Sequence, residues 1–251
     1  MTASFLDIED GRRLAYQKLE GSGVPIIFLA GHGSDMLGSK AEALYEDCKQ
    51  KGRSFIRFDY SGHGQSDGAF LDGTISQWTK DATAIIDHLT NGPVILVGSS
   101  LGGWIMLNLA KKLGTKIVGL IGIAAAPDFT ETLIWNELDE RQRQKMKEEG
   151  QIALPNPYAD EDVIYPYHLI TDGRQNLLLQ SDLPISCPIF LHQGMQDHEV
   201  PWQTAIDIAN AVTSEDVTIN LVKGAGHRFS TEAEIAAIIA SVDVIYKKIS
   251  A

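Results

Sequence analysis

Two adjacent serines lie within residues 98–102, whose sequence is Gly-Ser-Ser-Leu-Gly. A serine is presented as a nucleophile when it occupies a sharp turn from a strand into a helix, with glycine two positions before it and two positions after it. A side chain at either glycine position would collide with neighbouring backbone. Only Ser100 has this spacing, because Val97 and Leu101 are the residues two positions away from Ser99. The pattern predicts that Ser100 is a nucleophile and that Ser99 only fills the turn.

The surrounding sequence supplies the elements that such a turn needs. Residues 93–97 form an apolar run typical of a buried strand, and residues 101–113 have the apolar spacing of a helix. The alternative is an ordinary glycine-containing turn capped by a serine. The strand before the turn and the helix after it favour the nucleophile.

A serine hydroxyl needs a base that removes its proton, and the base needs an acid that orients it. In hydrolases with this turn the three residues follow the chain order Ser, Asp or Glu, His. Asp197 comes in the loop after the apolar run 189–191, and His227 ends a glycine-rich turn after the run 217–222. Because carboxyl ends of parallel strands meet at one edge of a sheet, the sequence predicts that Asp197 and His227 complete a triad with Ser100.

Other residues compete for the same two roles. Asp128 and Glu199 are alternative acids, and His192 and His198 are alternative bases. Asp128 follows an earlier apolar run, where it can open an insertion instead. His198 directly follows the proposed acid, so that its ring is better placed to line the rim of the site than to reach the nucleophile.

The negative charge that develops on a substrate carbonyl oxygen is usually held by two backbone N–H groups. One of them is expected from Leu101, which follows the nucleophile. The other is expected just after the apolar run 25–29, from His32 in one register and from Ser34 in the other. The length of the run favours the backbone N–H of His32, and its imidazole is assigned no catalytic role.

The glycine-rich stretch at residues 59–67 is interpreted as a structural turn. It lacks the Lys-Ser or Lys-Thr pair of a P-loop and the helix-opening pattern of a dinucleotide site. It therefore predicts a support for the site and no phosphate-binding function.

Composition and charge limit the partners that we expect. The chain has 251 residues and a formal net charge of -12, without a basic run along which a nucleic acid could lie. Cys48 and Cys187 lack the spacing of a metal site or a disulfide framework, and we expect no metal and no organic cofactor. The first ten residues show no leader and no stretch is long enough to span a membrane, so we predict a soluble, cytoplasmic protein. The sequence does not indicate an oligomeric state.

Apolar runs and helical segments alternate along the chain, which predicts a mostly parallel sheet with helices on both sides. Residues 5–8 and 14–18 add an opening hairpin. The predicted strands occupy residues 25–29, 54–58, 94–97, 117–123, 189–191 and 217–222, and the predicted helices occupy residues 40–51, 74–89, 101–113, 202–212 and 231–249.

The alternation stops between residues 128 and 184, where no confident strand is found and residues 137–150 form a polar helix. We predict a small helical cap, inserted into one domain that spans residues 1–251. Trp135, Tyr158 and Tyr165 are its candidates for an apolar substrate pocket, although each of them can equally pack the cap onto the domain. The basic residues of the polar helix are candidates for contact with an anionic leaving group, and a solvated helix face is their simpler interpretation.

The motifs at 59–66 and 98–102, together with Asp197 and His227, resemble those of the α/β-hydrolase family. The resemblance is strongest to the branch that contains mitochondrial palmitoyl-protein thioesterase, also described as mycophenolic acid acyl-glucuronide esterase. The missing leader fits either a bacterial relative or a processed form. Further matches to this branch occur at residues 34–41, 97–104, 124–131, 172–174, 193–195, 200–202 and 226–228.

The resemblance implies an eight-stranded, mostly parallel sheet and hydrolysis of esters or thioesters of small-molecule or acylated substrates, with Ser100, Asp197 and His227 as the triad. Two other classes of function use the same fold. A receptor without turnover would normally have lost part of the triad, and a carbon-carbon bond hydrolase would keep the triad in a different pocket. Dehalogenases and epoxide hydrolases of this fold have aspartate at the nucleophile position, where this chain has serine.

Overall fold

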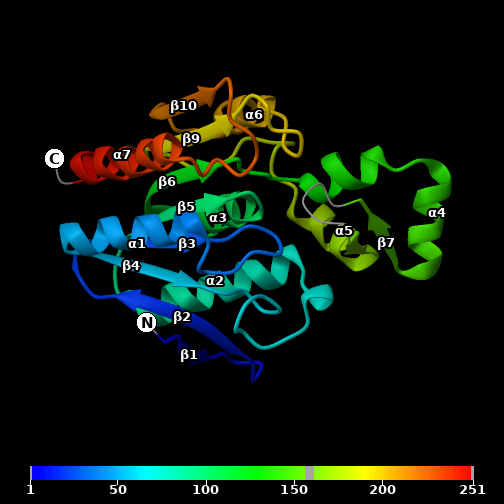
Figure 1. Cartoon of the computed structure of the whole chain (residues 1–251), viewed down its shortest axis with the longest axis horizontal. Helices are drawn as coiled ribbons and strands as arrows, with labels where there is room; N and C mark the ends of the chain where they lie inside the picture. Colours follow the sequence, from blue (N-terminus) through cyan, green and yellow to red (C-terminus); the bar gives the residue numbers. More distant parts are fainter. Residues whose placement is uncertain (1, 156–160, 250–251) are drawn as a thin grey trace.

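The computed structural model describes residues 2–155 and 161–249, and its centre is an eight-stranded sheet (Figure 1). Across the sheet the strand order is β1-β2-β4-β3-β5-β6-β9-β10. Strand β2 runs antiparallel to both of its neighbours, and all other neighbouring pairs are parallel. The strands are β1 (Ser4–Asp7), β2 (Arg13–Leu19), β3 (Ser22–Leu29), β4 (Arg53–Phe58), β5 (Val94–Ser99), β6 (Ile117–Ile123), β9 (Ile189–Gly194) and β10 (Val217–Val222).

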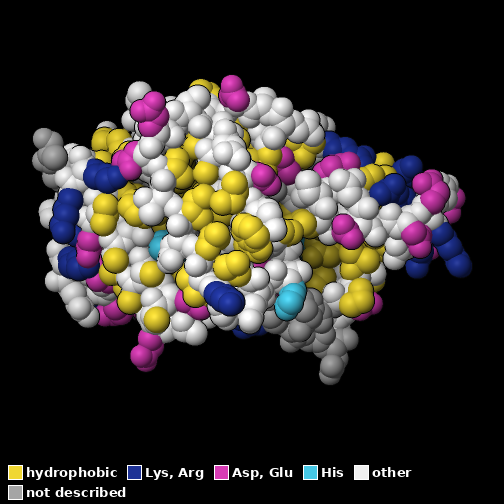
Figure 2. All heavy atoms as spheres, turned by 90° about the horizontal axis from the view of Figure 1, so that it is seen from above, with side chains coloured by type: hydrophobic (Ala, Val, Ile, Leu, Met, Phe, Trp, Pro, Cys, Tyr) yellow, Lys and Arg dark blue, Asp and Glu magenta, His cyan; other side chains and the backbone are white. Residues whose placement is uncertain are grey.

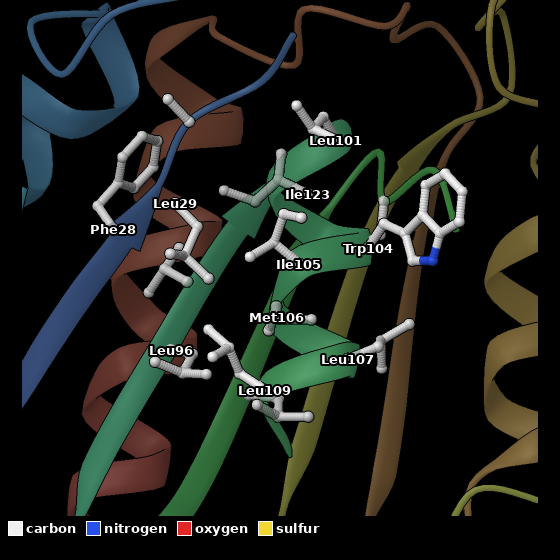
Figure 3. Close-up of a cluster of buried hydrophobic side chains, with 14 of the residues drawn as sticks. Phe28, Leu29, Leu96, Leu101, Trp104, Ile105, Met106, Leu107, Leu109 and Ile123 are labelled. Atoms are coloured by element: carbon white, nitrogen blue, oxygen red, sulfur yellow. The ribbon is translucent and has the colours of Figure 1, made fainter. Parts of the chain in front are cut away.

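The predicted fold class is confirmed, including the opening hairpin of β1 and β2. Helix α1 packs against α7, and α2 packs against α3. Figure 3 shows α3 and α7 on opposite sides of the sheet, so that central strands are covered on both faces. The helices that cover the two faces of the sheet are α1 (Ser39–Lys51), α2 (Ile75–Leu89), α3 (Leu101–Leu113), α6 (Gln203–Ala211) and α7 (Glu232–Ile249).

The core explains why the predicted strands are continuous apolar runs. Every residue of β5 is buried, because α3 lies on one face of this strand and the opposite face is also covered. In Figure 3 the side chains of Leu29, Ile123 and Ile105 gather between the strands and α3. Burial of each aliphatic side chain of this size contributes roughly 1.5–3 kcal/mol. The turn between β5 and α3 is therefore anchored at both ends in the most buried part of the molecule.

Between β6 and β9 the chain leaves the sheet and forms a lobe, seen at the right of Figure 1. We call residues 128–184 the cap segment. It holds the helices α4 (Glu140–Glu149) and α5 (Tyr167–Gly173), as the polar-helix pattern predicted for the first of them. It also holds a two-stranded antiparallel sheet of β7 (Gln151–Leu154) and β8 (Val163–Pro166). The prediction found no strand here, because each strand has only four residues and neither alternates strictly between apolar and polar side chains.

Helix α4 begins with a capping box, in which Asp139 and Gln142 each bond the other's backbone N–H. Met146 is its one buried residue. Figure 2 shows charged side chains of both signs crowded at this end of the molecule. The helix thus forms a mostly solvated outer face of the lobe.

Candidate active site

Ser100 lies on the turn from β5 into α3 in a strained backbone conformation, with φ of 52° and ψ of -118°. The two flanking glycines are required by close backbone contacts. A Cβ atom on Gly98 would lie 2.4 Å from the carbonyl oxygen of Gly102, and one on Gly102 would lie 2.0 Å from that of Leu29. A non-glycine residue at positive φ that the fold holds in place is typical of a functional site. The turn thus has the geometry that the glycine spacing predicted.

The structure brings the three predicted triad residues together from three different strand ends. The Nε2 atom of His227 lies 3.1 Å from the hydroxyl oxygen of Ser100, and its Nδ1 atom lies 2.9 Å from Oδ2 of Asp197. When Nδ1 carries the proton and donates it to the carboxylate, Nε2 is left free to accept the serine proton. The arrangement can therefore move a proton from the serine to the histidine.

The carboxylate of Asp197 is fully buried and has four hydrogen-bond partners. Oδ1 accepts from the backbone N–H groups of Glu199 and Val200, and Oδ2 accepts from Gln193 and His227. Burial by itself raises the pKa of Asp197, but the bonds from His227 and from the two N–H groups outweigh it and hold that pKa below its usual value. Asp197 is therefore ionised at neutral pH and fixed in orientation.

A second carboxylate lies at the other nitrogen of the same ring. Oε2 of Glu199 is 3.8 Å from Nε2 of His227. Glu199 was an alternative acid in the sequence analysis, but the contact with Nδ1 is made by Asp197. The side chain of Glu199 is 35% exposed, whereas that of Asp197 is fully buried.

Leu101 directly follows Ser100, and Gly31, the residue before His32, packs against the same turn, since a Cβ atom on Gly31 would lie 3.4 Å from the Cβ of Ser100. In the described part of the chain, the backbone N–H groups of His32 and Leu101 have no acceptor. The alternative donor, the N–H of Ser34, is already bonded to the carbonyl oxygen of Gly31 at 3.1 Å. This bond favours the register in which His32 is the donor.

Residues 59–67 hold the loop that follows β3 and contains His32. The sequence analysis predicted such a supporting role for this stretch. Nε2 of His63 accepts the N–H of Gly33 at 3.2 Å, and Nδ1 of His63 bonds the carbonyl oxygen of Ser61. Asp59 accepts the N–H of Met36 at 2.7 Å. These bonds fix the loop that follows β3 and, with it, the direction of the His32 N–H.

The imidazole of His32 lies in an aromatic cluster formed with Phe70, Trp78, Phe129 and Tyr165. It stacks on Tyr165 of β8 with ring centroids 5.7 Å apart and an angle of 14° between the planes. The centroids of the other three rings lie 4.7–6.1 Å away. Burial lowers the pKa of His32 to about 3, so the ring is neutral at physiological pH. The cap segment thus contacts His32, a predicted oxyanion donor, through Tyr165.

A second pocket candidate, Trp135, has other neighbours. Cations of the cap segment surround the ring of Trp135, with Arg174, Lys147 and Arg143 at 4.5, 5.4 and 5.5 Å from its centroid. These contacts favour the packing interpretation of Trp135. Tyr158 lies outside the described residues.

The alternative acid Asp128 and the alternative base His192 form hydrogen bonds with other parts of the fold. Both carboxylate oxygens of Asp128 accept backbone N–H groups, from Leu178 at 2.8 Å and from Leu179 at 2.9 Å. Asp128 therefore joins the two ends of the cap segment. The ring of His192 is bonded to Ser241 of α7 and to Asn220 of β10, away from Ser100.

Two further residues that position the triad were missed in the sequence. Gln193 donates both to Asp197 and to the carbonyl oxygen of Val200, and Nζ of Lys40 donates to the carbonyl oxygen of Arg228 at 2.6 Å. Gln193 carries a signal that could have revealed it, since it is a buried polar residue at the end of an apolar strand. Lys40 carries none, because its partner is 188 positions away.

Within residues 2–155 and 161–249 no group of His, Cys, Asp and Glu side chains is arranged to hold a metal ion. In the same ranges, none of the helices has the length and apolar character needed to cross a membrane. Two surface hollows of about 630 and 570 Å³ lie at the end of α7 and at the base of the cap segment, and neither is lined by a triad residue.

Comparison with known proteins gives one family and a set of close relatives. Residues 25–153 match the family described as serine aminopeptidase, S33. The human and bovine mitochondrial palmitoyl-protein thioesterases ABHD10 are 42% and 41% identical over 248 residues, which is 98% of this chain and 81% of each relative.

Solved structures agree. Mouse α/β hydrolase domain-containing protein 10 superposes with a TM-score of 0.92 at 39% identity, covering 99% of this chain and all of that one. A putative hydrolase from Agrobacterium vitis S4 has the same TM-score at 35% identity, covering 98% of this chain and all of that one.

The prediction of a cytoplasmic location is wrong on this comparison, because the relatives that match nearly the whole chain are named mitochondrial. The prediction depended on the absence of a leader in the first ten residues. A targeting segment is no part of the folded domain, so its absence says nothing about the compartment.

Proposed function

We propose that this chain, which belongs to the serine aminopeptidase S33 family of α/β-hydrolases and is a relative of palmitoyl-protein thioesterases, cleaves carboxylic esters or thioesters. The reaction passes through an acyl-enzyme on Ser100. The observation that supports this most directly is the continuous chain of hydrogen bonds from Ser100 through His227 to Asp197. In this proposal the cap segment is an insertion within a single domain. The reaction requires neither a metal nor an organic cofactor.

In the first half of the reaction, His227 takes the proton of Ser100 at Nε2 while the serine oxygen attacks the acyl carbonyl carbon. The backbone N–H groups of His32 and Leu101 hold the oxygen that becomes negative. Removing one fixed donor of an oxyanion hole costs roughly 3–4 kcal/mol in a serine protease of a different fold. The ionised Asp197 keeps the ring in the required tautomer and stabilises the imidazolium that forms.

The first half ends when His227 gives its proton to the leaving oxygen or sulfur, and the alcohol or thiol departs. In the second half water attacks the acyl carbon and loses a proton to Nε2 of His227. His227 then returns this proton to the oxygen of Ser100 as the acid is released. The residues are regenerated, so one set of groups serves both halves.

The acyl group that we propose is apolar. Tyr165, Phe70 and Phe129 surround the neutral ring of His32 next to the proposed oxyanion donors. A charged acyl chain would lose its hydration against these aromatic side chains without gaining a hydrogen-bond or ion-pair partner. The name of the relatives, palmitoyl-protein thioesterase, agrees with an apolar acyl group on a thiol.

The test is covalent labelling with a fluorophosphonate probe, with the site identified by peptide mass. We expect one label on Ser100 and none on the Ser100→Ala variant. A folded protein that takes no label would contradict the proposal and support a receptor. Label on Ser100 together with cleavage of carbon-carbon bonds, and no turnover of any ester or thioester, would support the second enzyme class.

A further inference from the structure

Glu199 is the charged residue at the site that the proposed reaction does not use. Its backbone N–H donates to Oδ1 of Asp197 at 2.9 Å, which fixes its position two residues after the acid. Its carboxylate reaches past the ring of His227 to the opposite side, 3.8 Å from Nε2. The same histidine therefore has one carboxylate at each nitrogen.

The two carboxylates differ in what they can reach. All contacts of Asp197 lie within the protein, where four donors surround its buried oxygens. The side chain of Glu199 is partly exposed, at the nitrogen that also bonds the hydroxyl of Ser100. A charge in this position acts on whatever enters the site.

The charge of Glu199 also extends toward the cap segment. Burial raises the pKa of Tyr165, and the negative charge of Glu199 raises it further. Tyr165 stacks on His32, whose backbone is a proposed oxyanion donor. The charge of Glu199 therefore acts on Tyr165 of the cap segment as well as on His227.

The proposed reaction limits how far a leaving group can be from this carboxylate. The leaving atom must come within about 3.2 Å of Nε2 to receive its proton. Since Oε2 of Glu199 is 3.8 Å from the same nitrogen, the leaving atom lies no more than about 7 Å from the carboxylate. This is inside the screening length of about 8 Å at physiological ionic strength.

We propose that Glu199 selects substrates by the charge of the leaving group, favouring cationic over neutral and neutral over anionic alcohols or thiols. The inference depends on the proposed function, because it takes Nε2 of His227 as the proton donor. The favoured class is an acyl group on a neutral or basic thiol or alcohol. The disfavoured class carries a carboxylate or phosphate close to the scissile bond.

Cations near the histidine oppose this preference in part. Arg228 follows His227 and is exposed, and Lys40 donates to its carbonyl oxygen. Both cations remain in a variant of Glu199 alone. Comparing the two enzymes therefore reports the effect of removing the glutamate charge, including any part that acts through these cations.

The experiment uses three thioesters of one short acyl chain, made with thiocholine, 2-mercaptoethanol and 3-mercaptopropionate. These carry a positive, a neutral and a negative leaving group, and kcat/KM is measured from the released thiol. The intrinsic reactivity of each thiol cancels when wild type and Glu199→Gln are compared on the same set. We expect the cation-to-anion ratio of kcat/KM to fall on the order of tenfold in Glu199→Gln, because the variant loses both the attraction of a cationic leaving group and the repulsion of an anionic one at a partly exposed site.

Three controls separate charge from structure. Glu199→Asp should retain part of the preference, because it keeps a carboxylate. Glu215→Gln removes an exposed carboxylate before β10, at the opposite end of that strand from the site, and should leave the ratio unchanged. Raising the salt concentration should reduce the ratio in the wild type, whereas in Glu199→Gln, where Arg228 and Lys40 remain, the ratio should not fall.

A ratio that stays within twofold in Glu199→Gln, or that falls equally in Glu215→Gln, would overturn the inference. A uniform loss of activity on all three substrates would also count against it, because it would place Glu199 in the chemistry without a role in selection. The proposed function has a separate test in the neutral thioester. If Ser100→Ala hydrolyses that substrate as fast as the wild type, the triad proposal fails.

Discussion

At the scale of single residues, adjacent side chains of one type have very different surroundings. Ser99 is the last residue of β5 and is paired with Ile123, whereas Ser100 is lifted out of the strand by its positive φ. One residue of displacement separates a strand residue from a side chain that reaches His227. The strain at Ser100 is maintained by the close contacts of Gly98 and Gly102.

This difference predicts opposite outcomes for two alanine variants. Ser100→Ala should lower kcat on an activated ester by more than about a thousandfold, because loss of a triad member usually costs at least this much. Ser99→Ala should retain substantial turnover, since its hydroxyl has no part in the proton transfer. Steady-state kinetics on p-nitrophenyl acetate measures both, and similar losses in the two variants would contradict the assignment.

The residues of the site that could be predicted are those with local signals. The glycine spacing around Ser100, the loop of Asp197 after one strand and the glycine-rich turn of His227 after the next are all visible in short windows. The role of Glu199 at Nε2 was not visible, because it depends on how two loops face each other. Likewise, the clamp from Lys40 to the carbonyl of Arg228 joins distant positions through backbone that carries no side-chain signal.

At the scale of elements, β9, β10 and α7 are joined by a buried histidine. Asn220 donates to Nδ1 of His192, so the proton is on Nε2 and is donated to Ser241. Burial lowers the pKa of His192 to about 4. The ring is therefore neutral in the folded protein, while an unfolded chain protonates it below about pH 6.5.

The consequence is a loss of stability in acid. Between about pH 6.5 and pH 4 the unfolded state binds more protons than the folded state, so the free energy of unfolding falls as pH falls, by up to about 1.4 kcal/mol per pH unit. Urea titrations should show a smaller fall in His192→Gln. The exposed His88→Gln is the matched control, and parallel curves for wild type and His192→Gln would count against this account.

The buried carboxylate of Asp128 holds the base of the cap segment. Asp128 has φ of 61° and a buried carboxylate whose two acceptors hold the N–H groups of Leu178 and Leu179. Asparagine tolerates this φ but presents an NH₂ group to one of the two donors. Asp128→Asn should lower the free energy of unfolding by about 2–4 kcal/mol, measured by urea denaturation. Asp182→Asn, exposed at the same base, should change it by less than about 0.5 kcal/mol.

At the scale of the whole molecule, the sheet was predicted more completely than the cap segment. Strands β6 and β10 match the predicted runs and β4 agrees within one residue, while β5 extends two residues beyond its run. Burial on both faces makes β5 and β6 nearly continuously apolar. The cap segment has short strands and a helix with a single buried residue, so its pattern is weak. Trp135 illustrates the limit, since an aromatic residue in a cap suggests a pocket until its cationic neighbours are seen.

The triad unites distant parts of this architecture. Ser100 rests on a central strand covered on both faces, while His227 follows β10, which pairs only with β9 at the edge of the sheet. Edge strands open locally at a lower free-energy cost than central ones. Under the proposed mechanism, detachment of β10 would withdraw His227 and leave Ser100, the loop after β3 and most of the core in place. We therefore expect activity to be lost at a smaller opening free energy than that of global unfolding.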